Sequence, residues 1–253
     1  KLKKHYLKYG CCHLSIIPLR KEKDHKSELV SQFLYGDSFK IIKKKDNWLY
    51  VSGLLDHYEG WIEQKQQQEI SEKNAIALNK NPILAFDLVH YVVSQNGLKP
   101  VVIGSNVGVS DFFGDEFDGQ VVSKKKNKTM LCDFAHLYRN APYLWGGKTP
   151  FGIDCSGLVQ MVYRLYGINL PRDAYQQAEI GASLSFIEES EPGDLAFFDN
   201  QQGDIIHVGI LLKNHNIIHA HGTVRVDQID QTGIFNIHNN MHSHKLRLIK
   251  RIV

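Results

Sequence analysis

A cysteine lies where the sequence predicts the start of a helix. Cys155 follows Asp154 and opens a run, up to Tyr166, whose apolar residues recur with helical period. Unpaired N–H groups and the positive end of the helix dipole at such a position favour a thiolate over a thiol. The thiolate is the nucleophilic form of cysteine, so Cys155 is a candidate catalytic residue. The alternative interpretation is a small buried residue beneath the helix.

Two histidines can supply the proton shuttle and the orienting group that a thiol nucleophile requires. His207 lies within the apolar run Ile205 to Leu212, and His219 lies within the run Asn216 to His221. If the runs form a hairpin centred on Lys213, residues 207 and 219 face each other directly, with Cβ atoms ~5 Å apart. One imidazole can then fix the tautomer of the other. The alternative is two structural histidines on a half-exposed sheet.

A metal site built from the same histidines is the alternative to the thiol site. His219 and His221 are two residues apart in a predicted strand, so their side chains share a face, and His207 can complete a three-histidine set. That pattern is typical of a zinc peptidase, but it gives the position of Cys155 no role. We therefore expect thiol chemistry, with no metal and no other cofactor.

The elements that must position these residues form an α+β domain, predicted over residues 127–253. Helical periodicity covers Thr129 to Arg139 and Ser156 to Tyr166, and Gly167 is well placed to end the second helix. Helices followed by an antiparallel sheet are typical of the α+β class. The predicted strands are Leu195 to Phe198, Ile205 to Leu212, Asn216 to His221 and Leu246 to Val253.

The residues before this domain have the pattern of small all-β modules. Short apolar runs at regular intervals predict an antiparallel barrel over residues 1–68: Leu14 to Pro18, Leu29 to Leu34, Phe39 to Ile42, Trp48 to Val51 and Gly60 to Ile62. The polar segment Glu63 to Glu69 is interpreted as a linker. Residues 69–126 are predicted to form a second, degenerate barrel with these strands: Ile76 to Leu78, Leu84 to Phe86, His90 to Val93 and Val101 to Ile103.

Composition narrows the class of protein. A chain of 253 residues with 43% hydrophobic content can bury a core, and 30 Lys and Arg against 27 Asp and Glu give no electrostatic footprint for nucleic acid. No stretch approaches the ~18 apolar residues of a membrane span. Four cysteines, two of them adjacent, make a poor disulfide framework and favour a reducing compartment.

Four motifs of the second half resemble the NlpC/P60 cysteine peptidases, in the order that the family has them. The motifs are Tyr143-Leu144-Trp145-Gly146-Gly147, Gly152-Ile153-Asp154-Cys155-Ser156-Gly157-Leu158-Val159, Pro192-Gly193-Asp194-Leu195 and His207-Val208-Gly209-Ile210. The resemblance implies a papain-like α+β fold for residues 127–253. It also implies that Cys155 is the nucleophile, that His207 is the base and that His219 orients the base.

The first half resembles the bacterial SH3-like modules of the dipeptidyl-peptidase VI enzymes. The resemblance rests on Pro18-Leu19-Arg20, on Ser31 to Asp37 and on Tyr58 to Ile62. It implies a γ-D-glutamyl-L-diamino acid peptidase that cuts murein peptides with a free N-terminal L-Ala, in the recycling or degradation of cell wall. The third residue, diaminopimelate or L-lysine, stays open.

The resemblance also implies a set of substrate-binding residues. A pocket for the terminal amine falls on Asp37, Tyr58, Asp154 and Ser156, further substrate contacts fall on Asp173 and Ala174, and Tyr143 would lie beside the sulfur, near the developing oxyanion. A buried ammonium needs carboxylates and other acceptors, which an internal peptide would leave unpaired. Asp37 stands where the family has Glu. Turn formation, barrel packing and helix capping are the alternatives for Asp37, Tyr58 and Asp154.

The expected partner is a murein peptide, with no nucleic acid and no membrane span, and a monomer is expected. The rival to an enzyme is a murein-binding module whose catalytic domain is inert. The cysteine usage and the lack of an apolar signal segment after Lys1 favour the bacterial cytoplasm. Because the sequence begins without Met, export after removal of a leader stays open.

Overall fold

The computed structural model describes residues 8–124, 126–237 and 240–253, and it divides into two compact units, Lys1–Val122 and Ser123–Val253. Residues 1–7, from which the expectation about a leader was drawn, lie outside the described part. None of the described helices is long and apolar enough to cross a membrane.

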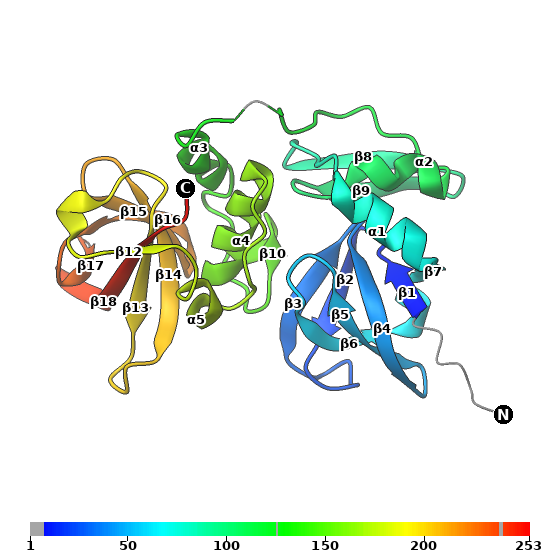
Figure 1. Ribbon diagram of the computed structural model, residues 1–253, viewed down its shortest axis with the longest axis horizontal. Coiled ribbons are helices and arrows are strands. Elements are labelled where there is room, and N and C mark those ends of the chain that lie inside the picture. The colour runs from blue at the N-terminus through cyan, green and yellow to red at the C-terminus, as the bar shows by residue number, and fades with distance from the viewer. Residues whose placement is uncertain (1–7, 125, 238–239) are drawn as a thin grey trace. The chain divides into compact units, whose positions relative to one another are not determined.

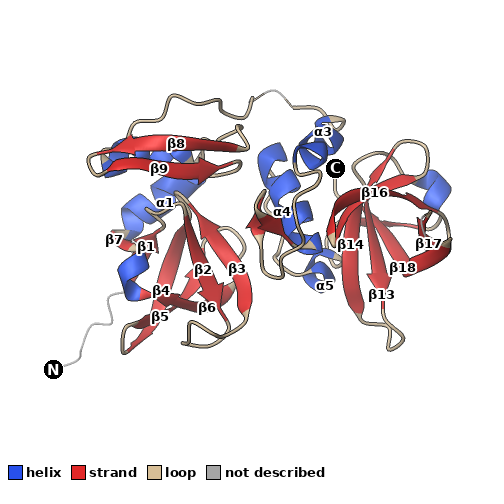
Figure 2. Ribbon diagram, turned by 180° about the vertical axis from the view of Figure 1, so that it is seen from behind, coloured by secondary structure: helices blue, strands red, loops and turns tan. Residues whose placement is uncertain are grey.

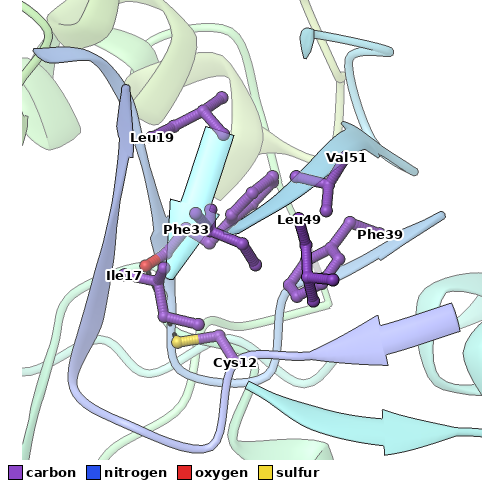
Figure 3. Close-up of a cluster of buried hydrophobic side chains, with 8 residues drawn as sticks. Cys12, Ile17, Leu19, Phe33, Phe39, Leu49 and Val51 are labelled. Atoms are coloured by element: carbon purple, nitrogen blue, oxygen red, sulfur yellow. Dashed lines mark hydrogen bonds between the residues drawn. The ribbon is translucent and has the colours of Figure 1, made fainter. Parts of the chain in front are cut away.

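The first unit begins with a seven-stranded antiparallel sheet, drawn in blue to cyan in Figure 1, in the order β3-β2-β6-β5-β4-β1-β7. Ile17 and Leu19 alternate with more exposed residues in β2, so one face of the strand is buried. Figure 3 shows the apolar cluster that this sheet surrounds, including Cys12 and Phe39. The strands are β1 (Lys8–Cys11), β2 (Ile16–Arg20), β3 (Leu29–Leu34), β4 (Ser38–Lys45), β5 (Trp48–Gly53), β6 (Glu59–Glu63) and β7 (Gln68–Ile70).

The polar segment Glu63 to Glu69 is not a linker, contrary to the prediction. It contains a 3-10 helix, η1 (Gln64–Gln66), and the start of β7, which pairs with β1 at the edge of the sheet. Its polar composition reflects the exposure of an edge strand, of which only Ile70 is buried. The chain therefore continues directly from the barrel into the rest of the first unit.

The strand predicted at Ile76 to Leu78 is wrong, because these residues lie in helix α1 (Glu72–Lys80). The side chain of Ser71 caps the helix by accepting a hydrogen bond from the Asn74 backbone N–H at 3.2 Å. The apolar run is too short to reveal its period, whereas the cap and the neighbouring Ala, Glu and Lys residues favour a helix.

The rest of the segment predicted as a second barrel is a β-hairpin with a short helix. Strands β8 (Val89–Ser94) and β9 (Gly97–Val102) pair through a turn, and η2 (Val107–Val109) leads into α2 (Ser110–Phe113). Residues 69–122 thus hold helices as well as strands. Val92 and Val101 pack in one cluster with Tyr35, so the hairpin shares a core with the residues that follow β3.

The second unit has the α+β architecture that the sequence predicts. Its antiparallel sheet runs β12-β18-β13-β14-β15-β16-β17, and a further pairing of β18 with β17 closes it. Helices α3 and α4 pack against each other and against β14 (Figures 1 and 2). The helices are α3 (Met130–Leu137), α4 (Cys155–Tyr166), α5 (Ala174–Gln177) and η3 (Ile187–Glu189). The strands are β10 (Lys148–Thr149), β11 (Gly152–Ile153), β12 (Ala182–Leu184), β13 (Leu195–Asp199), β14 (Ile205–Leu212), β15 (Asn216–His221), β16 (Thr223–Ile229), β17 (Gly233–Asn236) and β18 (Met241–Arg251).

Helix α4 is the central helix of this unit and has a defined cap at each end. Asp154 is its N-cap, and Gly167 ends it in the left-handed region, at φ 99°, as the sequence predicts. All of its residues except Tyr166 are buried. The first residue of α4, Cys155, is therefore held at a fixed place beside the sheet.

Candidate active site

Cys155 occupies the helix N-terminus that its sequence context predicts. The Asp154 carboxylate accepts a hydrogen bond from the Gly157 backbone N–H at 2.7 Å, which fixes the first turn of α4. The sulfur hydrogen-bonds with the backbone of Val208, the residue after His207 in β14, and with that of Ser156. The thiol therefore lies where the helix start meets the strand that carries the predicted base.

Burial determines the protonation state of this thiol. Removal from water raises the pKa of Cys155 to about 12, and the Asp154 carboxylate adds to the rise. The backbone hydrogen bonds and the Arg172 guanidinium lower the pKa, but they do not offset burial. The backbone N–H groups thus act in the expected direction, but burial outweighs them in the resting protein, in which Cys155 is a thiol that needs a base.

The two predicted histidines are in direct contact. His207 Nε2 and His219 Nδ1 are 2.8 Å apart, and the ring planes are nearly perpendicular, at 83°. Both side chains are buried, and His219 has no exposed surface. The structure thus brings together the base and the orienting group that the sequence assigns to this site.

The strand register that joins them differs from the predicted one. Strands β14 and β15 pair Leu212 with Asn216, so the turn is centred on Asn214 and not on Lys213. Asn214 and His215 hold left-handed backbone conformations, with φ of 59° and 54°, which shape this three-residue turn. The shift makes His207 and His219 diagonal neighbours.

Gly209 makes the diagonal contact possible. In this register Gly209 is the residue that faces His219, and a Cβ placed on it would lie 3.0 Å from the His219 Cβ. The same Cβ would lie 2.7 Å from Ile217 Cδ1, closer than side chains pack. The absence of a side chain at 209 therefore leaves room for the His219 ring to reach His207.

Both histidines are neutral at neutral pH. Burial lowers the pKa of His207 well below its usual value, and the neighbouring His219, His244 and His221 lower it further. Burial also lowers the pKa of His219, although Asp227 opposes the shift. A neutral imidazole at 207 can accept a proton, as a general base must.

Sequence reasoning missed two groups that contact the histidine pair. Asp227 in β16 lies with Oδ2 at 3.0 Å from His219 Nε2, and Arg225 donates to its other oxygen at 2.7 Å. His244 in β18 stacks on His207, with ring centroids 4.3 Å apart and planes inclined by 26°. No short motif marks these residues, but β16 follows β15 directly and places Arg225 opposite His219, with Asp227 two residues further along the same strand.

The Asp154 carboxylate accepts more hydrogen bonds than a helix cap alone requires. Arg172 binds it with two parallel hydrogen bonds, of 3.0 Å and 2.6 Å, and the Gly146 backbone N–H donates to it at 2.8 Å. Together with the Gly157 N–H, these donors fill the roughly four lone-pair positions of a carboxylate. Asp154 thus joins the loops of Gly146 and Arg172 to the start of α4, and its predicted contact with a substrate amine must compete with the buried Arg172.

The other predicted substrate contacts of this unit lie around the same arginine. Ser156 Oγ accepts a hydrogen bond from Arg172 Nη1 at 2.9 Å. Asp173 is the N-cap of α5 in a capping box with Gln176, and Ala174, which opens α5, is buried. Asp173 and Ala174 are thus held on a short helix next to Arg172, and their substrate role stays a prediction.

Tyr143 is partly exposed and lies close to Cys155. Its backbone N–H donates to the Gly222 carbonyl at 2.9 Å, and 37% of its surface is accessible. Burial raises the pKa of its hydroxyl to about 12, and the nearby Cys155 and Asp154 contribute to the rise. The hydroxyl thus stays protonated at neutral pH and can donate a hydrogen bond.

Asp37 and Tyr58 belong to the first unit, where both serve the barrel. Asp37 is buried, and its carboxylate accepts a hydrogen bond from the Leu34 backbone N–H at 2.8 Å across the turn. Tyr58 is half-buried and packs against the apolar cluster of the barrel. These are the turn and packing roles weighed as alternatives, and the predicted role of both residues in amine binding stays a prediction.

The arrangement of the histidines does not favour the zinc alternative. Both ring nitrogens of His219 have partners, namely His207 and Asp227, and the His219 and His221 rings lie parallel with centroids 6.2 Å apart. Among the residues that the structure describes, no three His, Cys, Asp or Glu side chains are grouped as metal ligands. The geometry is that of a hydrogen-bonded relay.

Comparison with known proteins finds a matching family profile in each half of the chain. The profile of the NlpC/P60 family matches residues 140–245, and that of the bacterial dipeptidyl-peptidase SH3 domain matches residues 19–66. A crystal structure of an NlpC/P60 family protein from Bacillus cereus has a similar fold, with a TM-score of 0.74 at 18% identity over 96% of this chain and 99% of that one. The resemblances seen in the sequence motifs are therefore confirmed.

Three curated relatives agree with these matches. A gamma-D-glutamyl-L-lysine dipeptidyl-peptidase from Bacillus cereus is 27% identical over 77% of this chain and 68% of its own length, and dipeptidyl-peptidase 6 from Lysinibacillus sphaericus is 28% identical over 83% and 88%. A probable endopeptidase from Haemophilus influenzae is 33% identical over 44% of this chain and 70% of its own length. The chain thus belongs to the NlpC/P60 family of peptidases and carries an N-terminal bacterial dipeptidyl-peptidase SH3 domain.

Proposed function

We propose that this peptidase hydrolyses the bond between γ-D-glutamate and the diamino acid in murein peptides that have a free N-terminal L-Ala. The observation that carries the proposal is the buried 2.8 Å contact between His207 and His219, next to a thiol at the start of α4. Two relatives bear names that support the substrate class, gamma-D-glutamyl-L-lysine dipeptidyl-peptidase and dipeptidyl-peptidase 6.

The chemistry begins with a neutral pair. His207 accepts the proton of the Cys155 thiol as the sulfur attacks the γ-D-Glu carbonyl carbon, and the bond to the diamino acid nitrogen breaks when the imidazolium returns the proton to that amine. A water molecule then loses a proton to His207 and attacks the thioester, releasing L-Ala-γ-D-Glu and restoring the thiol. The Tyr143 hydroxyl is a donor for the oxyanion in both steps.

The preference for a free amine rests on the cost of burying an unpaired charge. An ammonium that meets a carboxylate gains charge-assisted hydrogen bonds, whereas an acetylated amine leaves that carboxylate with one fewer donor. Because Asp154 already binds Arg172, we assign the selective contact for the amine to Asp37 and Tyr58, whose carboxylate and hydroxyl add acceptors of the first unit.

The test uses four substrates and the intact chain. L-Ala-γ-D-Glu-L-Lys and L-Ala-γ-D-Glu-meso-diaminopimelate are each offered with a free and with an acetylated L-Ala amine, and products are identified by mass spectrometry. We expect release of L-Ala-γ-D-Glu from the free-amine peptides and at least about a tenfold lower kcat/KM for the acetylated ones, the effect of one lost charged hydrogen bond.

Two variants separate catalysis from binding. Cys155→Ala should abolish cleavage while the circular dichroism spectrum stays unchanged, and Asp37→Asn should reduce the preference for the free amine more than it reduces kcat. Full activity of Cys155→Ala would refute the thiol mechanism, and equal rates on capped and free peptides would refute the amine pocket. Retention on intact murein without cleavage of any peptide would favour a binding module instead.

A further inference from the structure

A continuous hydrogen-bonded chain extends behind the histidine pair into the next strand. His207 in β14 contacts His219 in β15 at 2.8 Å, His219 Nε2 contacts Asp227 Oδ2 in β16 at 3.0 Å, and Arg225 Nη2 donates to Asp227 Oδ1 at 2.7 Å. The Asp227 side chain is only 8% exposed. Charged hydrogen bonds at such a buried position are strong and directional.

The chemistry of these groups fixes the direction of every hydrogen bond in the chain. An ionised carboxylate can only accept, so His219 Nε2 must carry the proton that it shares with Asp227. A neutral His219 then has a lone pair at Nδ1, and His207 Nε2 must donate to it. The proton of His207 thus lies on Nε2, and its Nδ1 has the lone pair that can take the Cys155 proton.

The surroundings of Asp227 keep it ionised. Burial alone would raise its pKa, but hydrogen bonds from His219 and Arg225 bring the pKa down to about 2. The groups that face His219 are His207 from β14, His221 from β15, Arg225 and Asp227 from β16, and His244 from β18. Asp227 is the one acidic group among them, so the orientation of His219 depends on it.

We propose that Asp227, held by Arg225, is a positioning residue that sets the tautomers of His219 and His207 and so directs the lone pair of His207 Nδ1 toward the thiol. The proposal rests on the proposed thiol mechanism, and it adds a positioning residue behind Cys155, His207 and His219. Asp227 acts through His219 and does not touch the reacting atoms.

The first measurement reads the tautomers directly. Long-range proton–nitrogen NMR spectra of the intact protein, with histidines labelled with nitrogen-15, report which ring nitrogen carries the proton in each imidazole. We expect both His207 and His219 to carry it on Nε2. The amide of Asp227→Asn can also donate to His219 Nε2, so in this variant we expect a population of both histidines with the proton on Nδ1.

The second measurement links the tautomer to catalysis. Asp227→Asn should lower kcat by at least about tenfold with little change in KM, as loss of a group that orients a catalytic imidazole does. The acid limb of the pH profile should move to lower pH, because a negative charge near the histidines is lost. In a His219→Ala background, Asp227→Asn should have no further effect on kcat.

A matched control comes from the same sheet. Asp230 also accepts a hydrogen bond from a histidine, His242 Nε2, at 2.9 Å, but this pair is exposed. Asp230→Asn should leave the tautomers of His207 and His219 and the value of kcat unchanged. A comparable loss of kcat in both variants would indicate a general effect on the sheet and would overturn the proposal.

The outcomes also separate this proposal from the proposed function. Protons on Nδ1 of His207 or His219 in the unmodified protein, or unchanged kcat in Asp227→Asn, would overturn the role of Asp227. The tautomers of the unmodified protein are measured without substrate, so they test the relay even if no murein peptide is cleaved or Asp227→Asn does not fold. If no murein peptide is cleaved, the NMR result stands and only the substrate assignment fails.

Discussion

At the scale of single residues, burial has the largest effect on the protonation of Cys155 and His207. The pKa of Cys155 rises to about 12 and that of His207 falls well below its usual value, and burial is the first cause in both groups. Both shifts disfavour charge, so the resting pair is a neutral thiol and a neutral imidazole. Charge develops only when the proton moves between them during attack.

This neutral pair predicts the pH dependence of catalysis. The value of kcat should be constant from about pH 6.5 to pH 9, and its acid limb should have a midpoint below 6.5, the ordinary pKa of histidine. We choose kcat because the free substrate loses the proton of its α-amine near pH 8, which by itself lowers kcat/KM. The sign follows from the mechanism, because protonation removes the base and a lowered pKa postpones that loss to lower pH. A profile that falls above pH 8, as an imidazolium–thiolate pair would give, contradicts this assignment.

Removal of the base gives the matching control. In His207→Ala the thiol must ionise by itself, so the rate of alkylation of Cys155 by iodoacetamide should rise about tenfold per pH unit between pH 7 and pH 9. In the unmodified protein the His207 imidazole accepts the proton, so the alkylation rate should rise less steeply with pH. Mass spectrometry of the labelled peptide separates Cys155 from the other three cysteines.

At the scale of elements, the sequence predicted those parts of the site that have a local signature. The start of α4 at Cys155 and its end at Gly167 follow from periodicity and capping, and the strands that hold His207 and His219 have the predicted bounds. The register between those strands was wrong by one position in the turn, because the turn geometry depends on the left-handed conformations of Asn214 and His215.

Residues that contact the site from distant parts of the sequence have no local signature. Asp227 and His244 contact the histidine pair only because β16 and β18 fold beside it, and Arg172 reaches Asp154 from the loop after α4. In the first unit, α1 was hidden because an apolar run of three residues fits a strand or a helix equally well. Short-range patterns therefore predict elements and motif residues. The strand register and the contacts of residues outside the motifs depend on long-range packing.

The diagonal histidine contact depends on the lack of a side chain at Gly209, which gives a prediction for the hairpin of β14 and β15. Gly209→Ala places a methyl group 2.7 Å from Ile217 Cδ1 and 3.0 Å from His219 Cβ, so strands or side chains must shift. We expect a loss of about 1–3 kcal/mol in the free energy of unfolding, as overpacking causes. Urea denaturation measures this loss, and kcat should fall as well because His219 is displaced.

A second substitution tests the cause of that loss. Ile217→Ala removes the nearest atoms at the cost of a cavity, so the double variant Gly209→Ala/Ile217→Ala should be more stable than the sum of the two single losses implies. Strictly additive losses would mean that the new methyl group does not meet Ile217. Unchanged stability and kcat in Gly209→Ala alone would show that the position tolerates a side chain.

At the scale of the whole molecule, the proposed catalytic groups Cys155, His207 and His219 all lie in the second unit, and their burial affects its stability. His207 and His219 are buried and neutral in the native state, but in the unfolded chain they take up protons near pH 6.5. The unfolded state therefore binds more protons below this pH. Stability is fully present above about pH 6.5 and is lost as the pH falls from 6.5 toward the lowered native pKa values.

This linkage predicts a steep loss of stability in acid. Each histidine that stays neutral in the native state contributes a slope of about 1.4 kcal/mol per pH unit below pH 6, so His207 and His219 together should contribute about twice that value. His244, whose pKa burial lowers to about 4, adds a contribution of the same sign. Urea denaturation at several values between pH 7 and pH 5, followed by circular dichroism, measures the slope. His219→Gln removes one titrating group, so its slope should be lower by about one histidine's contribution even though the variant is less stable at pH 7. An equal slope in both proteins would mean that His219 is already protonated in the native state, and the directed relay from Asp227 to the thiol would then lack the neutral imidazole on which it depends.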